Sequence, residues 1–175
     1  DASTLGNATR TIVGANVRAN LIERGRALGR EFGDDDAELQ TLAMARNAEK
    51  VSAADYALAV RTVHRVGRQV AAFFGDFDLL LSPTMATPPK KLGLLALDNE
   101  NTEEFVGHLM QTVGFTQLMN VAGNPAASVP LATSESGLPI GIQFAAAFGE
   151  EATLLRLSAQ LEEARPWRNR RPSLA

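Results

Sequence analysis

Two histidines are the residues of this chain whose ordinary pKa values best suit acid–base chemistry near neutral pH. His64 and His108 are far apart in the sequence, and both lie in segments with a helical pattern. A catalytic base needs a nucleophile within hydrogen-bond reach, and the sequence places none beside either histidine. We therefore interpret both as hydrogen-bonded histidines of the interior or its boundary.

Motifs that mark other kinds of reactive site are absent from the sequence. It contains no Gly-x-Ser-x-Gly turn, no phosphate-binding glycine loop, and no Gly-x-Gly-x-x-Gly after a strand. Three adjacent carboxylate pairs diverge around a helix instead of converging on one substrate. These pairs are Glu103–Glu104, Glu150–Glu151 and Glu162–Glu163. The acidic run Asp34–Asp36 lacks the further oxygen ligands of a hard-cation loop, so we interpret it as a helix start.

The elements that could position such residues begin with helices. Leu5–Arg24 has a helical composition, and a stronger helix runs from Ser52 to Phe74 with apolar residues at helical spacing. Asp55, three residues after Ser52, completes a capping box. Asp78–Ser82 is a short apolar run closed by a proline, which is typical of a strand buried on both faces. A helix that leads directly into a buried strand indicates an α/β layer.

The second half of the chain is predicted to combine helices and strands. Prolines and lysines in Thr84–Leu97 predict a loop across the surface or the mouth of a site. Two segments have helical spacing, and two short apolar segments flank a polar turn. The helices are Glu103–Met119 and Glu150–Ala164, the strands are Ala126–Val129 and Ile140–Ala147, and the turn is Ser134–Gly137.

Length and composition indicate one globular domain. The chain has 175 residues, 45% of them hydrophobic, and we divide it into a helical segment at 1–76 and a strand-and-helix part at 77–175. The net charge of -3 predicts no nucleic acid and no membrane surface as a partner. The absence of cysteine and of a long apolar stretch favours a soluble, cytoplasmic protein. Because Asp1 begins the chain, we expect it to be cut from a longer protein.

Four motifs occur in order along the second half of the chain. They are Asp78-Leu-Leu-Leu-Ser-Pro-Thr84, Phe115-Thr-Gln-Leu-Met-Asn-Val-Ala-Gly-Asn-Pro-Ala126, Gly137-Leu-Pro-Ile-Gly-Ile-Gln143, and Glu151 with Leu154-Leu155 and the closing Leu161-Glu162 and Pro166-Trp167. Together they resemble the C-terminal part of the amidase signature family. The ending Pro166-Trp-Arg-Asn-Arg-Arg-Pro172 is similar to the branch of bacterial amidases that contains 6-aminohexanoate cyclic dimer hydrolase. The resemblance is sharp from about Phe77 to Pro172 and looser before Ala72.

The resemblance implies a mixed β-sheet covered by helices and hydrolysis of carboxylic amide bonds. Members of the family use a serine nucleophile, a bridging serine in a cis peptide and a lysine base, without metal or cofactor. Those residues belong to the N-terminal half of the family's proteins, and Lys50, Lys90 and Lys91 have no Gly/Ser-rich partner segment here. The resemblance therefore implies that an N-terminal part of the same amidase completes this chain, that the substrate is a small-molecule amide, and that this chain alone is inactive.

The resemblance and the strand pattern together predict residues that border the substrate. In the family, the helix before the Asn-x-x-Gly-x-Pro-Ala element borders the acyl side of the channel, while Thr84 follows a strand end, where ligands of open α/β sheets bind. The predicted substrate-binding residues are Thr84, Thr112, Phe115, Thr116, Met119 and Asn120. Each of these predictions has a structural alternative to substrate binding. Thr84 could simply form a turn, and Phe115 and Met119 could be ordinary core residues. For Asn120 we favour capping at a helix end, and for Gln143 a bond to a neighbouring backbone group.

Two other functions are open at this level. One is the tRNA-linked amidotransferase subunit of the same family, which would need a partner that delivers ammonia and a surface for tRNA. The acidic balance of the chain gives that function little support. The other is a non-catalytic binding or assembly module that uses the Thr84–Leu97 loop and the helix around Phe115 for a partner. The sequence also leaves a homo-oligomer open.

Overall fold

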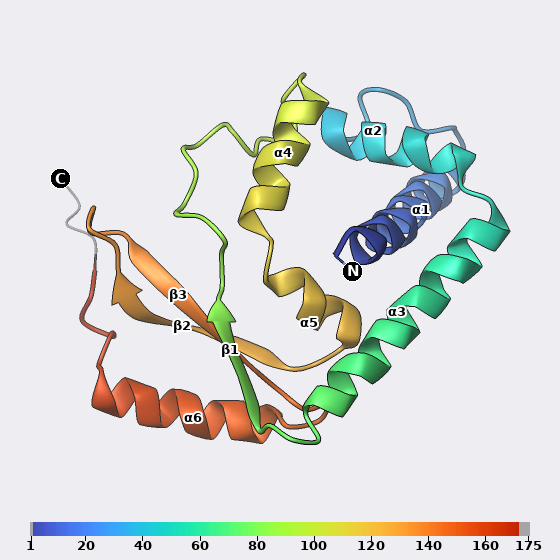
Figure 1. The fold of residues 1–175 in the computed structure, drawn as a ribbon. Coiled ribbons are helices and arrows are strands. Elements are labelled where there is room, and N and C mark those ends of the chain that lie inside the picture. The colour runs from blue at the N-terminus through green and yellow to red at the C-terminus, as the bar shows by residue number, and fades with distance from the viewer. Residues whose placement is uncertain (1, 172–175) are drawn as a thin grey trace. The chain divides into compact units, whose positions relative to one another are not determined.

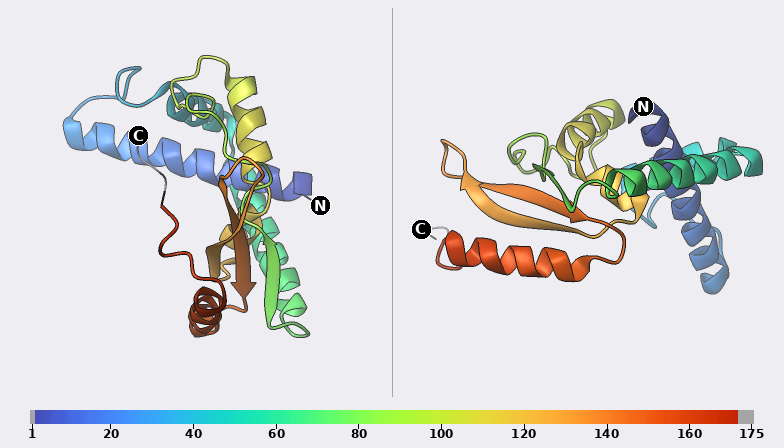
Figure 2. Two further views of the ribbon diagram at one scale, coloured as in Figure 1. Left: turned by 90° about the vertical axis from the view of Figure 1, so that its left-hand side faces the viewer. Right: turned by 60° about the horizontal axis from the view of Figure 1, so that its bottom comes forward.

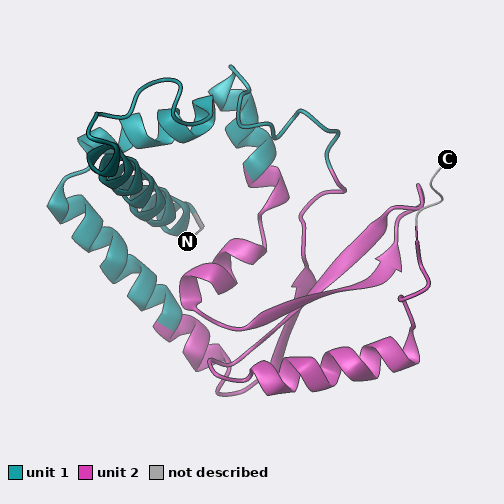
Figure 3. Cartoon of the chain, turned by 180° about the vertical axis from the view of Figure 1, so that it is seen from behind, with its two compact units in different colours: residues 1–67, 90–109 teal, residues 68–89, 110–175 magenta. Residues whose placement is uncertain are grey.

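The computed structural model describes residues 2–171, which form the helices and strands of Figure 1. These residues group into two compact units (Figure 3). Unit 1 comprises the residues up to 67 together with residues 90–109, and unit 2 comprises residues 68–89 together with those from 110 onward. The division of the chain at residue 76 stays a prediction.

Unit 1 is helical, as the sequence predicts for the first part of the chain. Its elements are α1 (Ala2–Leu28), α2 (Leu39–Asn47), the 3-10 turn η1 (Ala48–Lys50), most of α3 (Ala53–Phe73) and most of α4 (Thr102–Thr112). α1 contains the predicted helix and approaches η1 closely, since a Cβ on Gly14 would lie 3.4 Å from the Cβ of Ala48. None of the helices in residues 2–171 is long and apolar enough to cross a membrane.

Gln40 ties α2 to the loop that precedes α4. Its backbone N–H donates to the Leu97 carbonyl at 2.8 Å, and its side-chain Nε2 donates to the Asn99 carbonyl at 2.6 Å. The same nitrogen lies 3.1 Å from Oγ1 of Thr102. An unpaired buried amide would cost about 1–3 kcal/mol. These bonds therefore explain how a glutamine with 5% of its surface exposed is accommodated in unit 1.

The predicted capping box at the start of α3 is confirmed. The Asp55 N–H donates to Oγ of Ser52 at 3.1 Å, and the Ser52 N–H donates to the Asp55 carboxylate at 3.0 Å. The acidic run behaves differently, because α2 begins at Leu39 and Asp34–Asp36 lie in the loop before it. The prediction that this run starts a helix is wrong, since two of its carboxylates pair with arginines instead.

Unit 2 is built on a three-stranded sheet with a helix along one face. The strands β1 (Leu79–Pro83), β2 (Ala126–Thr133) and β3 (Pro139–Ala146) have the order β1–β3–β2. α6 (Glu151–Ala164) follows β3 and runs beside the sheet (Figure 2). The predicted polar turn joins β2 to β3, with Gly137 at a φ of 85°. The α/β fold class is confirmed, and the strand pairs in residues 2–171 are all antiparallel.

The core of unit 2 lies between the sheet and α6. Its buried members are Val129, Phe144, Ala146 and Leu154, and Leu79, Leu157, Leu161 and Trp167 are among the side chains that pack against them. Side chains alternate between the two faces of a strand, so Ser128 and Gln143 point away from this core. The sheet therefore has an apolar face toward α6 and a face with polar side chains on its other side.

The single helix predicted over Glu103–Met119 is wrong, because the structure has two helices there. α4 ends at Thr112, and α5 (Thr116–Ala122) begins after Phe115. Gly114 lies at the break, where a Cβ would be 3.3 Å from the Cβ of Ala86. The apolar spacing continues through the break, whereas the close approach of Ala86 comes from a distant segment and leaves no trace in the local pattern.

β1 is an edge strand in residues 2–171, where the sequence predicts a strand buried on both faces. Within the described part of the chain, β1 pairs with β3 alone. Leu79 packs against the core, but the side chain of Leu81 is 62% exposed. The prediction of burial on both faces is therefore wrong for the described chain, because no element covers Leu81.

Candidate functional site

Thr84 lies directly after β1, and its hydroxyl meets that of Ser128 on β2. Oγ1 of Thr84 and Oγ of Ser128 are hydrogen-bonded at 2.6 Å. The Thr84 N–H donates to the Gly141 carbonyl at 3.0 Å, so the bonding between β1 and β3 continues to this residue. Ser128 is exposed and Thr84 is half-buried. The two hydroxyls form an accessible pair on the sheet face opposite α6.

The two hydroxyls occupy space beside Gly141 on the central strand, because glycine has no side chain there. A Cβ at position 141 would lie 2.7 Å from Oγ of Ser128 and 2.9 Å from Oγ1 of Thr84. These distances are shorter than carbon and oxygen atoms approach without a bond, and both neighbours are short side chains, one on β2 and one directly after β1. Glycine is therefore required here for close approach, and not for an unusual backbone angle.

A buried amide lies two residues farther along β3. Gln143 is 5% exposed, and its Nε2 donates to Oγ of Ser82 at 3.0 Å. The Ser82 hydroxyl in turn donates to the Pro83 carbonyl at 3.1 Å. The predicted backbone partner of Gln143 is wrong, because a side-chain hydroxyl from β1 takes that place. We call Ser82, Thr84, Ser128 and Gln143 the polar sheet face.

The break between α4 and α5 lies beside the segment that follows Thr84. The Ala86 N–H donates to the carbonyl of Thr112 at 3.2 Å, and Thr112 itself is buried. Phe115 is 42% exposed at the start of α5, and Oγ1 of Thr116 donates to the carbonyl of Val113 at 3.4 Å. The structure thus brings three of the predicted residues together with Thr84. We call the segments 84–86 and 112–116 the rim.

The last two predicted residues differ from each other in their surroundings. Met119 is 3% exposed and lies in the interior. The Asn120 side chain is exposed and has no hydrogen-bond partner within residues 2–171, so its predicted capping role is wrong. Gly123 ends α5 at a φ of 75°, and Nδ2 of Asn124 donates to the Ala146 carbonyl at 2.7 Å. Asn124, in the same motif, therefore fixes the turn into β2.

The rim and the polar sheet face combine hydrogen-bonding groups with apolar surface. Each hydroxyl of the Thr84–Ser128 pair can donate and accept a hydrogen bond. Met85 and Phe115 are 38% and 42% exposed and supply the apolar part. Within residues 2–171 the two hydroxyls bond only to each other, so no base activates them. Among residues 2–171, this region therefore offers hydrogen-bonding hydroxyls and apolar side chains, without an activated nucleophile.

The sequence prediction missed Ser128 and Gly141, although both lie in motifs that it singled out. The signal that could have found them is the pairing of the two strands, which sets Ser128 opposite Gln143. Register depends on the partner strand as well as on the strand itself, and an irregularity between Val129 and Ala132 shifts it further. Neither position could therefore be placed beside Thr84 from the sequence of one segment.

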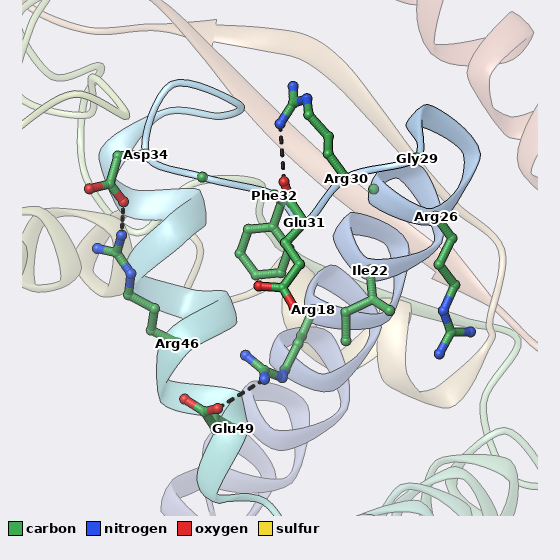
Figure 4. A pocket seen from close by; sticks show the side chains of 12 residues that line it. Arg18, Ile22, Arg26, Gly29, Arg30, Glu31, Phe32, Asp34, Arg46 and Glu49 are labelled. Carbon is green, nitrogen blue, oxygen red and sulfur yellow. Dashed lines mark hydrogen bonds and ion pairs between the residues drawn. The ribbon is translucent and has the colours of Figure 1, made fainter.

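Unit 1 contains a separate cavity of about 830 Å³ at the end of α1 (Figure 4). Its charged side chains are largely paired: Arg18 with Glu49 at 3.1 Å, and Arg46 with Asp34. Nearby, hydrogen bonds from the Arg30 guanidinium and the Gly33 N–H hold the pKa of the Asp36 carboxyl well below its usual range. Of the described residues, no serine, threonine, histidine or lysine lines the cavity. Its arginines and carboxylates join α1 to the following segments and offer no nucleophile.

The acidic and histidine side chains do not gather into a metal site among the described residues. In residues 2–171, no group of three or more His, Asp or Glu residues is arranged to hold a metal ion. None of the predicted site residues is a typical metal ligand, and the rim and polar sheet face consist of hydroxyl, amide, thioether and aromatic groups. The candidate site in unit 2 is therefore described by hydrogen bonding and apolar contact alone.

Comparisons with known proteins agree with the motifs of the second half of the chain. The sequence model of the amidase family matches residues 5–155. The chain is 40% identical over 150 residues to AmiC of Mycobacterium leprae, which is provisionally named as an amidase. That match covers 85% of this chain and 31% of AmiC. It is 34% identical over 170 residues to 6-aminohexanoate-cyclic-dimer hydrolase of Paenarthrobacter ureafaciens, with 94% of this chain and 34% of that protein covered.

Solved structures show the same relationship in three dimensions. The structure of 6-aminohexanoate cyclic dimer hydrolase superposes with a TM-score of 0.89 at 32% identity and covers 99% of this chain and 37% of that one. A bacterial aryl acylamidase shares the fold, with a TM-score of 0.75 at 24% identity. The chain spans about a third of the length of the curated relatives it matches.

Proposed function

This chain belongs to the amidase family, and from that membership we propose that it is the C-terminal part of an enzyme that hydrolyses carboxylic amide bonds. The observation that carries the proposal is the match of nearly the whole chain to about a third of 6-aminohexanoate cyclic dimer hydrolase. The matched region includes the rim and the polar sheet face. A preceding segment of the same amidase would complete the enzyme.

The catalytic groups in this proposal lie on that preceding segment. Its serine Oγ attacks the amide carbonyl carbon while the lysine amine accepts the hydroxyl proton, with a second serine in between. The C–N bond breaks, the amine leaves with a proton, and water then hydrolyses the acyl-serine ester. The lysine must be neutral to act as a base, which requires surroundings that lower its pKa. Backbone N–H groups of the same segment would stabilise the oxyanion.

In the proposal, this chain supplies part of the substrate pocket. Thr84 and Phe115 have accessible side chains at the rim, and Thr116 and Asn120 lie farther along α5. Thr112 and Met119 are buried, so they would contribute indirectly: Thr112 would hold the α4–α5 break in place, and Met119 would hold α5. The exposed Thr84–Ser128 pair suits the polar group of an amide substrate, and Met85 and Phe115 suit its apolar portion.

Amide hydrolysis by the separated and combined parts tests the proposal. The chain, the preceding segment and the two co-expressed are each incubated with 6-aminohexanoate cyclic dimer, a linear amide and an aryl amide, and the released amine is measured. We expect release only when both parts are present. Hydrolysis by this chain alone would overturn the proposal. So would a stable, stoichiometric complex of both parts that cleaves none of the three substrate classes.

A further inference from the structure

The cavity in unit 1 has a size and a lining that suit a small-molecule ligand. Its volume of about 830 Å³ falls within the range of ligand pockets, roughly 300–1,000 Å³. Arg18, Ile22 and Arg26 follow one another at four-residue intervals on α1, so their side chains share one face of the helix. Phe32 comes from the loop after α1 and, like Ile22, is half-buried. The cavity therefore combines apolar surface with charged groups, and its lining residues belong to unit 1.

The loop that forms one wall of the cavity is held tightly against α1 at Gly25. The Arg30 N–H donates to the Gly25 carbonyl at 3.1 Å. A Cβ at position 25 would lie 2.6 Å from the Arg30 carbonyl oxygen, so only glycine allows the loop to approach the helix this closely. Farther along the loop, the Asp36 carboxylate accepts hydrogen bonds from the Arg30 guanidinium and from the Gly33 N–H. These bonds give the loop a defined position beside α1.

Among the described residues, three of the four arginines that line the cavity are paired with carboxylates. Two lining residues have charged side chains without such a partner in residues 2–171, and these are the guanidinium of Arg26 and the carboxylate of Glu31. Both side chains are exposed. The cavity therefore offers one cation and one anion to a ligand, while its other charges compensate one another. The pairs are Arg18–Glu49, Arg30–Asp36 and Arg46–Asp34.

The unpaired cation and the unpaired anion lie on different sides of an apolar side chain. Ile22 comes one turn after Arg18 and one turn before Arg26 on α1. In Figure 4 the Glu31 side chain extends toward Arg18, whereas Arg26 lies on the opposite side of Ile22. This arrangement suits a molecule whose charges are separated by an apolar portion, and it does not suit one with both charges on the same carbon atom.

We propose that this cavity binds a zwitterionic small molecule that carries a carboxylate and an ammonium group at the two ends of an apolar chain. The Arg26 guanidinium donates to the carboxylate, and the Glu31 carboxylate accepts from the ammonium group. Ile22 and Phe32 pack against the apolar chain. A ligand with only one of the two charges leaves Arg26 or Glu31 without a partner. The proposal does not rest on the proposed function, because the rim and the polar sheet face consist of residues of unit 2.

Calorimetric titration of the full-length protein tests the two charges of the ligand separately. The first probe is 6-aminohexanoate, which has its charges at the ends of an unbranched methylene chain. Hexanoate lacks the ammonium group, hexylamine lacks the carboxylate, and norleucine is an isomer of the first probe with both charges at one end. We expect 6-aminohexanoate to bind at least about tenfold more tightly than each of the other three probes.

Replacing each charged side chain with glutamine assigns the two contacts. Arg26→Gln should weaken the binding of 6-aminohexanoate and hexanoate by about tenfold and leave that of hexylamine unchanged. Glu31→Gln should weaken the binding of 6-aminohexanoate and hexylamine and leave that of hexanoate unchanged. In each variant, the probe whose binding is unchanged shows that the protein is folded. Arg24→Gln removes an exposed arginine of α1 outside the cavity lining, and this control should leave all affinities unchanged.

Three results would overturn the proposal. The first is a wild-type protein that binds no 6-aminohexanoate, and the second is binding of that probe that neither Arg26→Gln nor Glu31→Gln weakens. The third is norleucine binding as tight as that of 6-aminohexanoate, because the two charges would then not need to be separated. Catalysis does not enter the test: a protein that hydrolyses no amide but shows the expected binding pattern contradicts the proposed function alone.

Discussion

At the scale of single residues, the candidate site depends on the space above Gly141. The Thr84 and Ser128 hydroxyls would lie 2.9 and 2.7 Å from a Cβ at this position. We expect Gly141→Ala to lower the free energy of unfolding by about 1–3 kcal/mol, because the added methyl forces the strands or the hydroxyls apart. The measurement is urea unfolding followed by circular dichroism.

A glycine without close neighbours provides the control for that substitution. Gly107 lies within α4, and a Cβ there meets no atom within 4 Å. Gly107→Ala is expected to stabilise the protein by about 0.5–1 kcal/mol, since alanine favours a helix. The Ser128→Ala background should reduce the cost of Gly141→Ala, because one of the two clashing oxygens is gone. Equal costs in both backgrounds would contradict the account of close approach.

Asn124 and Asn120 form a matched pair for a second test at this scale. The Asn124 amide donates to the Ala146 carbonyl at 2.7 Å, whereas Asn120 has an exposed side chain without such a bond. We expect Asn124→Ala to cost about 1 kcal/mol of unfolding free energy. Asn120→Ala should change it by less than about 0.5 kcal/mol. Reversed effects would show that Asn120, as predicted from the sequence, fixes the turn after α5.

At the scale of elements, the start of α3 links helix stability to pH. Hydrogen bonds from the Ser52 hydroxyl and backbone N–H lower the pKa of Asp55 below its ordinary value. Because the folded pKa is depressed, this contribution to stability is present above the ordinary aspartate pKa and is lost as the pH falls through the lowered one. We expect Ser52→Ala to cost about 1 kcal/mol near neutral pH.

The pH dependence of unfolding separates the capping box from a simple loss of packing. Asp55→Asn should remove the part of the acid-induced stability loss that this carboxylate causes, and Ser52→Ala should reduce it. Unfolding midpoints in urea between about pH 3 and pH 7 provide the measurement. An unchanged pH profile in both variants would contradict the role given to the capping box.

Elements with local signals were predictable from the sequence, and those set by distant contacts were not. The capping box and the polar turn depend on residues a few positions apart, and both predictions are confirmed. The helix break at Gly114 depends on the close approach of Ala86 from another segment. The exposure of Leu81 depends on which other elements pack beside β1. The candidate site follows the same rule. The strand end predicts Thr84 as a candidate, which stays a prediction, whereas Ser128 can be placed beside it only from the register between β2 and β3.

At the scale of the whole molecule, the chain belongs to the amidase family, and we propose that it is part of a larger enzyme. It covers about a third of each curated relative, and in residues 2–171 the hydroxyls of the candidate site bond only to each other. In the proposed function, the rim and the polar sheet face line part of the substrate pocket, and the activated nucleophile comes from a further segment.

Labelling with a serine-reactive fluorophosphonate most directly tests whether the catalytic serine lies on the preceding segment and not on this chain. The preceding segment and this chain are co-expressed as two polypeptides, purified together, treated with the probe and separated by denaturing mass spectrometry. We predict one adduct on the preceding segment, none on residues 1–175, and no adduct on either part alone. An adduct on this chain, at Ser128 or any other residue, would contradict this prediction.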